Sequence, residues 1–172
     1  MLKSDSIHDM SKNENPEGLR TWIEINRQAI SHNVGIFRSL IKKETKLCAV
    51  LKSNAYGHSL VDFAKEVEML GVDTIAVDSI IEALALRREG IKTPIVVLGY
   101  TLPEMLLIAI EHDISITLSH RDHVSSIIAI VKDKPISVHV KVDTGMHRQG
   151  FLLDEKDEVI HLLKKNAEKI KV

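Results

Sequence analysis

The sequence predicts an α/β fold built on a parallel β-sheet. Short apolar runs alternate with longer amphipathic segments, and four of these segments open with Ser or Thr followed three positions later by an acidic residue, as capped helices do. Hydrophobic residues make up 44% of the chain and charged residues 27%, which is typical of a folded domain. Strands that alternate with helices pair in parallel, and both a doubly wound sheet and a (β/α)₈ barrel fit this pattern.

The first predicted elements follow a polar stretch over residues 1–18. This stretch has no apolar core, which indicates a flexible tail and argues against a secretory signal. Residues 21–26 (TWIEIN) alternate like a strand, and the amphipathic helix after them is expected to end near residue 43. The apolar face of this helix is formed by Ile30, Val34, Phe37 and Ile41.

A buried strand is predicted over residues 46–51 (KLCAVL). The helix after it is expected to open at Ser59, with Asp62 as the partner in a capping box. Gly71 closes this helix because glycine tolerates the left-handed turn found at helix ends. The apolar stripe of the helix consists of Leu60, Phe63, Ala64, Val67 and Leu70.

The same pattern repeats towards residue 172. Strands are predicted over 74–77, 95–98, 115–118 and 137–142, and another strand begins at 169. The predicted cap pairs of the helices between them are Ser79 with Glu82, Thr101 with Glu104 and Ser119 with Asp122, and a last helix covers about 154–165. A (β/α)₈ barrel needs about 250 residues, so residues 19–172 would form about five of its βα units.

Composition excludes several kinds of partner and site. The formal net charge is −1, so we expect neither a nucleic-acid partner nor an anionic membrane partner. No apolar run is long enough to span a bilayer. The single cysteine, Cys48, lies in a strand run as a small buried residue and fits a cytoplasmic location. The histidines show no metal-ligand spacing, so no metal site is expected.

Two polar clusters directly follow predicted strands. The first is residues 52–58 (KSNAYGH), and the second is residues 143–150 (DTGMHRQG). Both candidate architectures place their active sites at the carboxyl ends of the strands. Helix caps explain the other polar residues at these strand ends, but they do not explain these two clusters, which are therefore the candidate sites.

Lys52 is the candidate nucleophile of the first cluster. A lysine at the end of a buried strand loses part of its hydration, which favours the neutral amine, and a neutral amine can form a Schiff base with an aldehyde. The phenol of Tyr56 could donate a hydrogen bond to a phosphate. From position alone, Lys52 as a solvated rim charge, Tyr56 as a packing residue and His58 as a cap or packing residue remain alternatives.

Lys141 and Arg148 are the candidates near the second cluster. Strand alternation puts Lys141 on the same face as His139 and Asp143. The planar guanidinium of Arg148 could bind a carboxylate or an oxyanion. An ordinary ion-pair network with Asp143 explains both residues equally well, so the residues alone leave this choice open.

The two clusters carry a resemblance to a known family. Residues 49–58 (AVLKSNAYGH) resemble the motif that contains the pyridoxal-phosphate (PLP) lysine in alanine racemases, whose usual form is close to AVVKANAYGHG. Residues 141–151 (KVDTGMHRQGF) resemble the second motif of that family, commonly KVDTGMGRLG. Segments 21–26, 79–90 and 94–99 are also similar, so the resemblance runs from about residue 21 to residue 172.

The resemblance implies the N-terminal part of a (β/α)₈ barrel, normally followed by a β-rich C-terminal domain. It also implies a PLP-dependent racemase that interconverts L-alanine and D-alanine for peptidoglycan. Lys52 would form the Schiff base with PLP and act as one of the two racemisation bases. An amino acid would therefore be the small-molecule partner.

The resemblance assigns roles to five further residues. Tyr56 would hydrogen-bond the cofactor phosphate, and Val50 and Leu98 would line the cofactor pocket. Arg148 would lie beside the phenolic oxygen of PLP and the substrate carboxylate. Lys141 matches a lysine that is carbamylated in some members of the family, where it orients that arginine.

The sequence departs from the family motifs within both clusters. Ser53 replaces alanine, and His147 and Gln149 replace the commoner glycine and leucine beside Arg148. The later barrel strands and the C-terminal domain, which in the family supplies a tyrosine as the second base across a homodimer interface, are not found in residues 1–172. We therefore expect this stretch alone to be inactive. A PLP-binding protein without racemase activity, or a racemase for another amino acid such as serine, remains an alternative.

Overall fold

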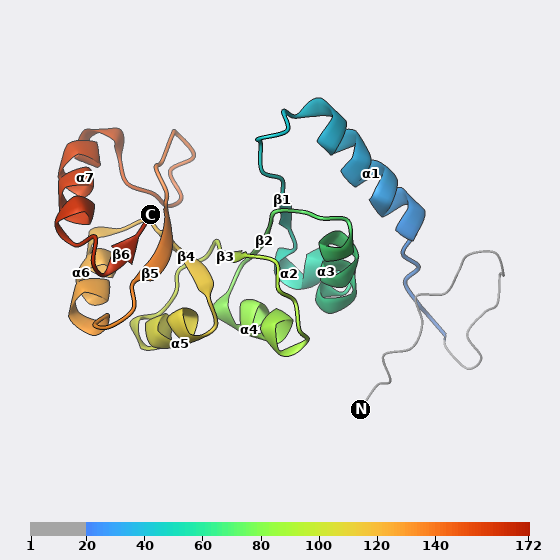
Figure 1. The fold of residues 1–172 in the computed structure, drawn as a ribbon, viewed down its shortest axis with the longest axis horizontal. Helices are drawn as coiled ribbons and strands as arrows, with labels where there is room; N and C mark the ends of the chain where they lie inside the picture. The colour runs from blue at the N-terminus through green and yellow to red at the C-terminus, as the bar shows by residue number, and fades with distance from the viewer. Residues whose placement is uncertain (1–19) are drawn as a thin grey trace.

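The computed structural model describes residues 20–172, so the predicted tail over residues 1–18 lies outside the described residues. Helices and strands alternate along the chain (Figure 1). The elements are α1 (Arg27–Leu40), β1 (Cys48–Val50), α2 (Lys52–Tyr56), α3 (Leu60–Met69), β2 (Thr74–Val77), α4 (Ile80–Arg88), β3 (Ile95–Val97), η1 (Pro103–Met105), α5 (Leu106–Glu111), β4 (Ile114–Leu118), α6 (Arg121–Ile130), β5 (Ile136–Val140), η2 (Leu153–Glu155), α7 (Lys156–Lys165) and β6 (Ile170–Lys171).

The strands of residues 20–172 form one six-stranded parallel sheet in the order β1-β2-β3-β4-β5-β6. Each strand pairs with the next one along the chain, as in the registers Val50 opposite Ala76 and Val77 opposite Val97. A doubly wound sheet reverses its strand order part-way, whereas a barrel adds each strand beside the previous one. Figure 1 shows the strands following an open curve, with α3 to α7 along its outer side. The prediction of the N-terminal part of a barrel is therefore confirmed.

Side chains of the strands alternate between two faces of the sheet. Every second residue joins the hydrophobic core beneath the helices: Ile75, Val77, Ile95, Val97, Ile114, Ile116, Leu118, Ile136 and Val138. The predicted stripe of α3 meets this core, with Leu60, Ala64 and Val67 buried. The other strand positions, including Val50 and His139, belong to the inner face of the curve by alternation.

The predicted strand over residues 21–26 does not form. These residues are irregular, and Asn26 instead caps α1 by accepting a hydrogen bond from the Ala29 N–H at 3.0 Å. An extended segment needs a neighbouring strand for its backbone donors and acceptors, and no strand within residues 20–172 lies beside it. Alternation alone therefore predicted the wrong structure here.

Two of the predicted helix caps lie on either side of β2. The Ser79 hydroxyl accepts from the Glu82 N–H at 3.3 Å, so the start of α4 is confirmed. Ser59 precedes α3 as predicted, but its φ of 71° is far from the extended conformation of an ordinary cap, and its side chain makes no cap hydrogen bond. Its hydroxyl donates to the Asp62 carboxylate at 2.6 Å instead.

The two later cap predictions are each wrong by one position. Leu102, not Thr101, precedes η1, and the Thr101 side chain is instead buried, with 1% of its surface exposed. His120, not Ser119, precedes α6, and its Nδ1 accepts from the Asp122 N–H at 3.3 Å. The helices therefore begin where the turn geometry permits rather than at the first residue with a capping hydroxyl.

The inner side of β1 is uncovered in the described part of the chain. Cys48 lies there and is exposed, so the prediction that it is buried is wrong. Within residues 20–172 no helix combines the length and hydrophobicity that a bilayer crossing requires. The same residues contain no group of three or more His, Cys, Asp or Glu side chains arranged to hold a metal ion.

Candidate active site

Lys52 lies directly beyond the carboxyl end of β1. The residue before it, Leu51, is buried, and its N–H donates to the Ala76 carbonyl on β2 at 2.7 Å. The chain is therefore held to the sheet up to the residue before the lysine. Lys52 itself is half-buried, and Val50, which precedes it on the inner face, is 41% exposed.

The residues that follow Lys52 form a left-handed turn. Ser53, Asn54, Ala55 and Tyr56 all have φ between 51° and 57°. This conformation costs about 1–2 kcal/mol per residue for most L-amino acids, and only asparagine among these four tolerates it well. The α2 segment is therefore a strained turn, which must be stabilised by its surroundings.

Three contacts stabilise this turn. Ala55 is packed in the core with 3% of its surface exposed, and its N–H donates to the Leu51 carbonyl at 2.8 Å. The Asn54 side-chain oxygen accepts from the Leu60 N–H at 2.8 Å and thereby caps α3. The Asn54 N–H donates to Oε1 of Glu82 on α4 at 3.0 Å. The sequence predicted Glu82 only as part of a helix cap.

The remaining residues of the first cluster have different surroundings. Tyr56 is 60% exposed and keeps its phenol available at the sheet edge. His58 packs its ring 5.8 Å from the Phe63 ring centroid, with Nδ1 2.8 Å from the Ala55 carbonyl. The alternative of a packing role for His58 is thus the one that its contacts support. Leu98 is half-buried and follows β3 at the same edge.

The second cluster forms a loop that closes on itself after β5. The Phe151 N–H donates to the Lys141 carbonyl at 2.8 Å, and the Asp143 N–H donates to the Phe151 carbonyl at 2.9 Å. Val142 and Phe151 form a bridge between the two arms of the loop. Phe151 is buried, so the base of the loop is anchored in the core. Lys141 stands at this base, half-buried.

Asp143 organises the interior of the loop. Its Oδ1 accepts from the N–H groups of Gly145 at 2.9 Å and His147 at 3.1 Å, and these hydrogen bonds lower the pKa of the Asp143 carboxyl. Among residues 20–172, no carboxylate lies within ion-pair distance of Lys141 or Arg148. The alternative of an ion-pair network with Asp143 is therefore not supported, and Arg148 is exposed.

His147 and Gln149, the two unusual residues beside Arg148, have distinct roles in this loop. His147 has a φ of 53°, which explains why the related motif has glycine at this position. The Gln149 side-chain amide donates to the Leu98 carbonyl at 3.1 Å and so ties the loop to the end of β3. Sequence reasoning identified both as departures but contained no signal for this contact.

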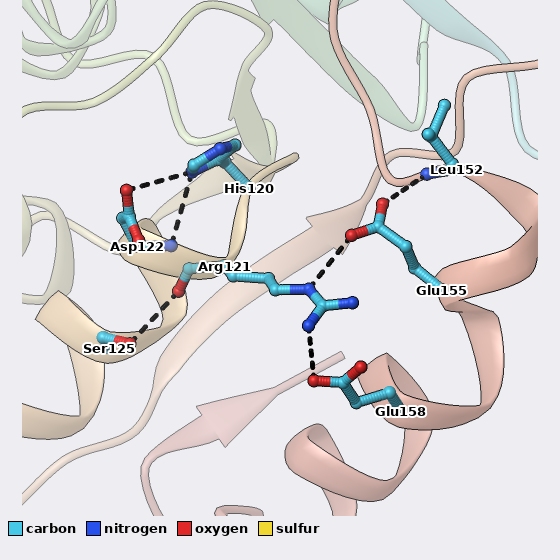
Figure 2. Close-up of polar contacts among 7 residues, drawn as sticks. All are labelled: His120, Arg121, Asp122, Ser125, Leu152, Glu155 and Glu158. Carbon is cyan, nitrogen blue, oxygen red and sulfur yellow. Dashed lines mark hydrogen bonds and ion pairs between the residues drawn. The ribbon is translucent and has the colours of Figure 1, made fainter.

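A salt-bridge cluster fixes the exit of the loop (Figure 2). The Arg121 guanidinium at the start of α6 binds the carboxylates of Glu155, at 3.0 Å, and Glu158. The second oxygen of Glu155 accepts from the Leu152 N–H at 2.7 Å, and this bond is the main reason why the pKa of Glu155 is lowered. The cluster therefore fastens the segment after Phe151 to α6.

The structure places the two candidate clusters at the same edge of the sheet. Lys52 follows β1 and Lys141 follows β5, and parallel strands present their carboxyl ends at one edge. No hydrogen bond or ion pair within residues 20–172 joins Lys52 to Arg148. The two clusters thus share an edge but do not contact each other through polar groups.

Comparisons with known proteins identify the family. The family model described as alanine racemase, N-terminal domain, matches residues 25–172. This chain belongs to the alanine racemase family. Alanine racemase 2 of Oceanobacillus iheyensis is 39% identical over 146 residues, which cover 84% of this chain and 37% of that protein. The alanine racemase of Methanococcus maripaludis is 41% identical over 140 residues, which cover 80% of this chain and 37% of that protein.

Solved alanine racemases have the same fold. The structure from E. faecalis superposes with a TM-score of 0.79 at 31% identity and covers 84% of this chain and 40% of that chain. The Clostridium difficile alanine racemase in complex with cycloserine has a TM-score of 0.76 at 35% identity and covers 85% of this chain and 40% of that chain. The chain thus spans about two fifths of the length of the alanine racemases that it matches.

Proposed function

We propose that this chain forms part of a PLP-dependent racemase that interconverts L-alanine and D-alanine. The observation that carries the proposal is the amine of Lys52, which is presented on a supported left-handed turn at the carboxyl edge of a barrel-type sheet. The relatives named alanine racemase support the substrate. The cycloserine complex of the Clostridium difficile relative supports a small-molecule ligand.

The residues at this edge suit PLP. Lys52 offers an amine for the aldehyde of the cofactor, and Tyr56 offers an exposed phenol that can donate to its phosphate. Val50 and Leu98 offer apolar surface for the ring. Arg148, which lacks a carboxylate partner within residues 20–172, can bind the phenolic oxygen and the substrate carboxylate. These groups match the chemical groups of PLP and of an amino acid.

PLP, when bound, supplies an electron sink that acidifies the Cα proton of the attached amino acid. The Nζ atom of Lys52 would hold the cofactor until the amine of the amino acid takes its place, and the freed lysine amine would then remove or return that proton on one face. Arg148 orients the carboxylate of the amino acid, and Lys141, if carbamylated, orients Arg148. Inversion at Cα requires a second base on the opposite face, and we assign it to a tyrosine of a partner subunit in a homodimer. A cytoplasmic enzyme of this kind supplies D-alanine for peptidoglycan.

Trapping the cofactor lysine tests the proposal. The full-length protein is incubated with PLP and reduced with borohydride, and the label is located by peptide mass mapping. We expect the label on Lys52 and its loss in Lys52→Arg. Lys46→Arg, which changes a lysine just before β1, serves as the matched control and should label normally. Label on any other lysine would overturn the assignment.

An activity assay tests the substrate. Full-length protein with PLP is expected to racemise alanine faster than serine. Preference for serine would overturn the substrate, and PLP on Lys52 without racemisation of either amino acid would make the protein a non-catalytic PLP binder.

A further inference from the structure

Glu82 links the lysine turn to the neighbouring βα unit. Its Oε1 accepts from the Asn54 N–H at 3.0 Å, and its Oε2 accepts from the Asp78 N–H at 2.9 Å. The Glu82 N–H meanwhile donates to the Ser79 hydroxyl at 3.3 Å. In an ordinary capping box the Glu82 carboxylate would return to the Ser79 N–H. Here it joins two loops that follow adjacent strands of the sheet.

The contact falls within the strained part of the turn. Asn54 is one of the four consecutive left-handed residues, and it lies two positions after Lys52. Its side chain is held by the Leu60 N–H and its backbone by Glu82. A strained turn persists only where its surroundings hold it, and Glu82 is the charged group that does so here. Loss of this contact would release the backbone next to the lysine.

We propose that Glu82 is a positioning residue for Lys52. It keeps the left-handed turn in place and thereby sets the direction in which the lysine amine leaves the sheet. The inference rests on the proposed role of Lys52 as the PLP lysine. A carboxylate suits this task because both of its oxygens accept charge-assisted hydrogen bonds. A glutamine has a single acceptor oxygen, and its NH₂ group would face a second N–H donor.

Glu68 provides a matched control. Its Oε1 accepts from the Lys92 and Thr93 N–H groups, both at 2.7 Å, and from the Thr93 hydroxyl at 2.8 Å. It is thus another helical glutamate that holds backbone N–H groups of a neighbouring loop. This loop precedes β3, so it lies at the amino edge of the sheet, away from Lys52.

The test compares Glu82→Ala, Glu82→Gln and Glu68→Ala in the full-length protein. Two quantities are measured: amide hydrogen exchange over residues 52–58 without PLP, and the rate at which Lys52 becomes trappable by borohydride after PLP is added. Glu82→Ala is expected to speed exchange and slow trapping, each about tenfold, which is the scale of one charge-assisted hydrogen bond. Glu82→Gln, which retains one acceptor and most of the side-chain packing, is expected to change each by about threefold.

The control separates positioning from general stability. Glu68→Ala should lower the thermal midpoint but leave both quantities unchanged. If Glu82→Ala resembles Glu68→Ala in both amide exchange and trapping rate, the positioning role is wrong. If Glu82→Ala does not fold, unchanged exchange and trapping in Glu82→Gln would overturn the role. If the wild-type protein never acquires PLP on Lys52, the proposed function fails and the role of Glu82 towards the cofactor fails with it, whatever the exchange data show about the turn.

Discussion

In the loop over residues 143–150, the backbone conformation at two positions restricts which amino acids they tolerate. His147 has a φ of 53°, and its Nδ1 lies 3.7 Å from Oδ2 of Asp143. Gly150 has a φ of 134°, and a Cβ at that position would lie 2.5 Å from the Asp143 nitrogen. The loop therefore requires glycine at position 150, whereas position 147 tolerates a side chain at an energetic cost.

His147→Gly is expected to raise the free energy of unfolding by about 1 kcal/mol. Relief of the left-handed backbone favours the variant by about 1–2 kcal/mol, and the lost exposed pair with Asp143 opposes it by at most about 1 kcal/mol. Urea denaturation measures the difference. Gly150→Ala is the contrasting variant and should lower the same free energy by about 1–3 kcal/mol. If His147→Gly instead lowers the free energy of unfolding, the contact between the His147 imidazole and Asp143 outweighs the backbone strain.

Arg148→Ala is expected to reduce racemase turnover on the order of a hundredfold, the scale of removing one charged ligand-orienting donor. The thermal midpoint should stay within about 1 °C, because Arg148 makes no ion pair within residues 20–172 and surface pairs contribute only about 0–1 kcal/mol. Both quantities are measured on the full-length protein.

Arg38→Ala is the matched control for Arg148→Ala. The Arg38 guanidinium binds the Asp73 carboxylate and the Gly71 carbonyl, both at 2.7 Å, far from the candidate edge. This control should lower the midpoint and spare turnover. If Arg148→Ala instead lowers the midpoint and spares turnover, Arg148 is a structural residue.

A buried histidine, His123, lies where α6 packs against the segment before η1. His123 in the first turn of α6 is 0% exposed, and its ring lies 4.7 Å from the Tyr100 ring centroid, beside the segment that leads into η1. Neither ring nitrogen has a hydrogen-bond partner within the described residues. Burial lowers the pKa of His123 below its ordinary value, because the charged form would lose its hydration.

The lowered pKa of His123 predicts a loss of stability in mild acid. The unfolded chain binds a proton near pH 6.5, whereas the folded chain does so only at lower pH. Stability is therefore retained above pH 6.5 and falls as the pH drops below it, by up to about 1.4 kcal/mol per pH unit. Urea denaturation at pH 7.5 and pH 5.5 measures this loss. His123→Phe should reduce the loss, and an equal loss in both proteins would remove His123 as its cause.

The open sheet governs how residues 20–172 are expected to behave on their own. Within residues 20–172, β1 pairs only with β2, and β6 pairs only with β5, so one side of each edge strand has no partner. The inner-face residues Cys48 and Val50 are exposed at the first of these edges. Unpaired strand edges and uncovered apolar surface favour association with other chains.

A polypeptide of residues 1–172 alone is therefore expected to show no measurable alanine racemisation with added PLP. It should also associate in a concentration-dependent way. Racemisation is followed by circular dichroism or a coupled assay, and association by light scattering, with an alanine racemase of known structure as the control. Slow exchange of the alanine Cα proton with solvent is expected to survive through Lys52, since one base suffices for it. Robust racemisation by the purified polypeptide would show that one base is enough, contrary to the proposed mechanism.

Local patterns in the sequence were sufficient for most of the fold. The strands over 74–77, 95–98, 115–118 and 137–142 were predicted within one or two residues, because buried parallel strands appear as apolar runs. The strand over 21–26 was predicted wrongly because a strand depends on a partner that its own sequence does not specify. The caps predicted at Thr101 and Ser119 were displaced by one residue, because turn geometry sets where a helix begins.

The sequence by itself determined the order of the elements, the family and the identity of the candidate residues, since periodicity and motif chemistry are properties of neighbouring residues. Only the tertiary structure showed what holds the lysine turn and the arginine loop in place. Glu82 reaches Asn54 across 28 positions, and Gln149 reaches Leu98 across 51 positions. Contacts between residues so far apart depend on how the βα units pack side by side, and no local pattern encodes that packing.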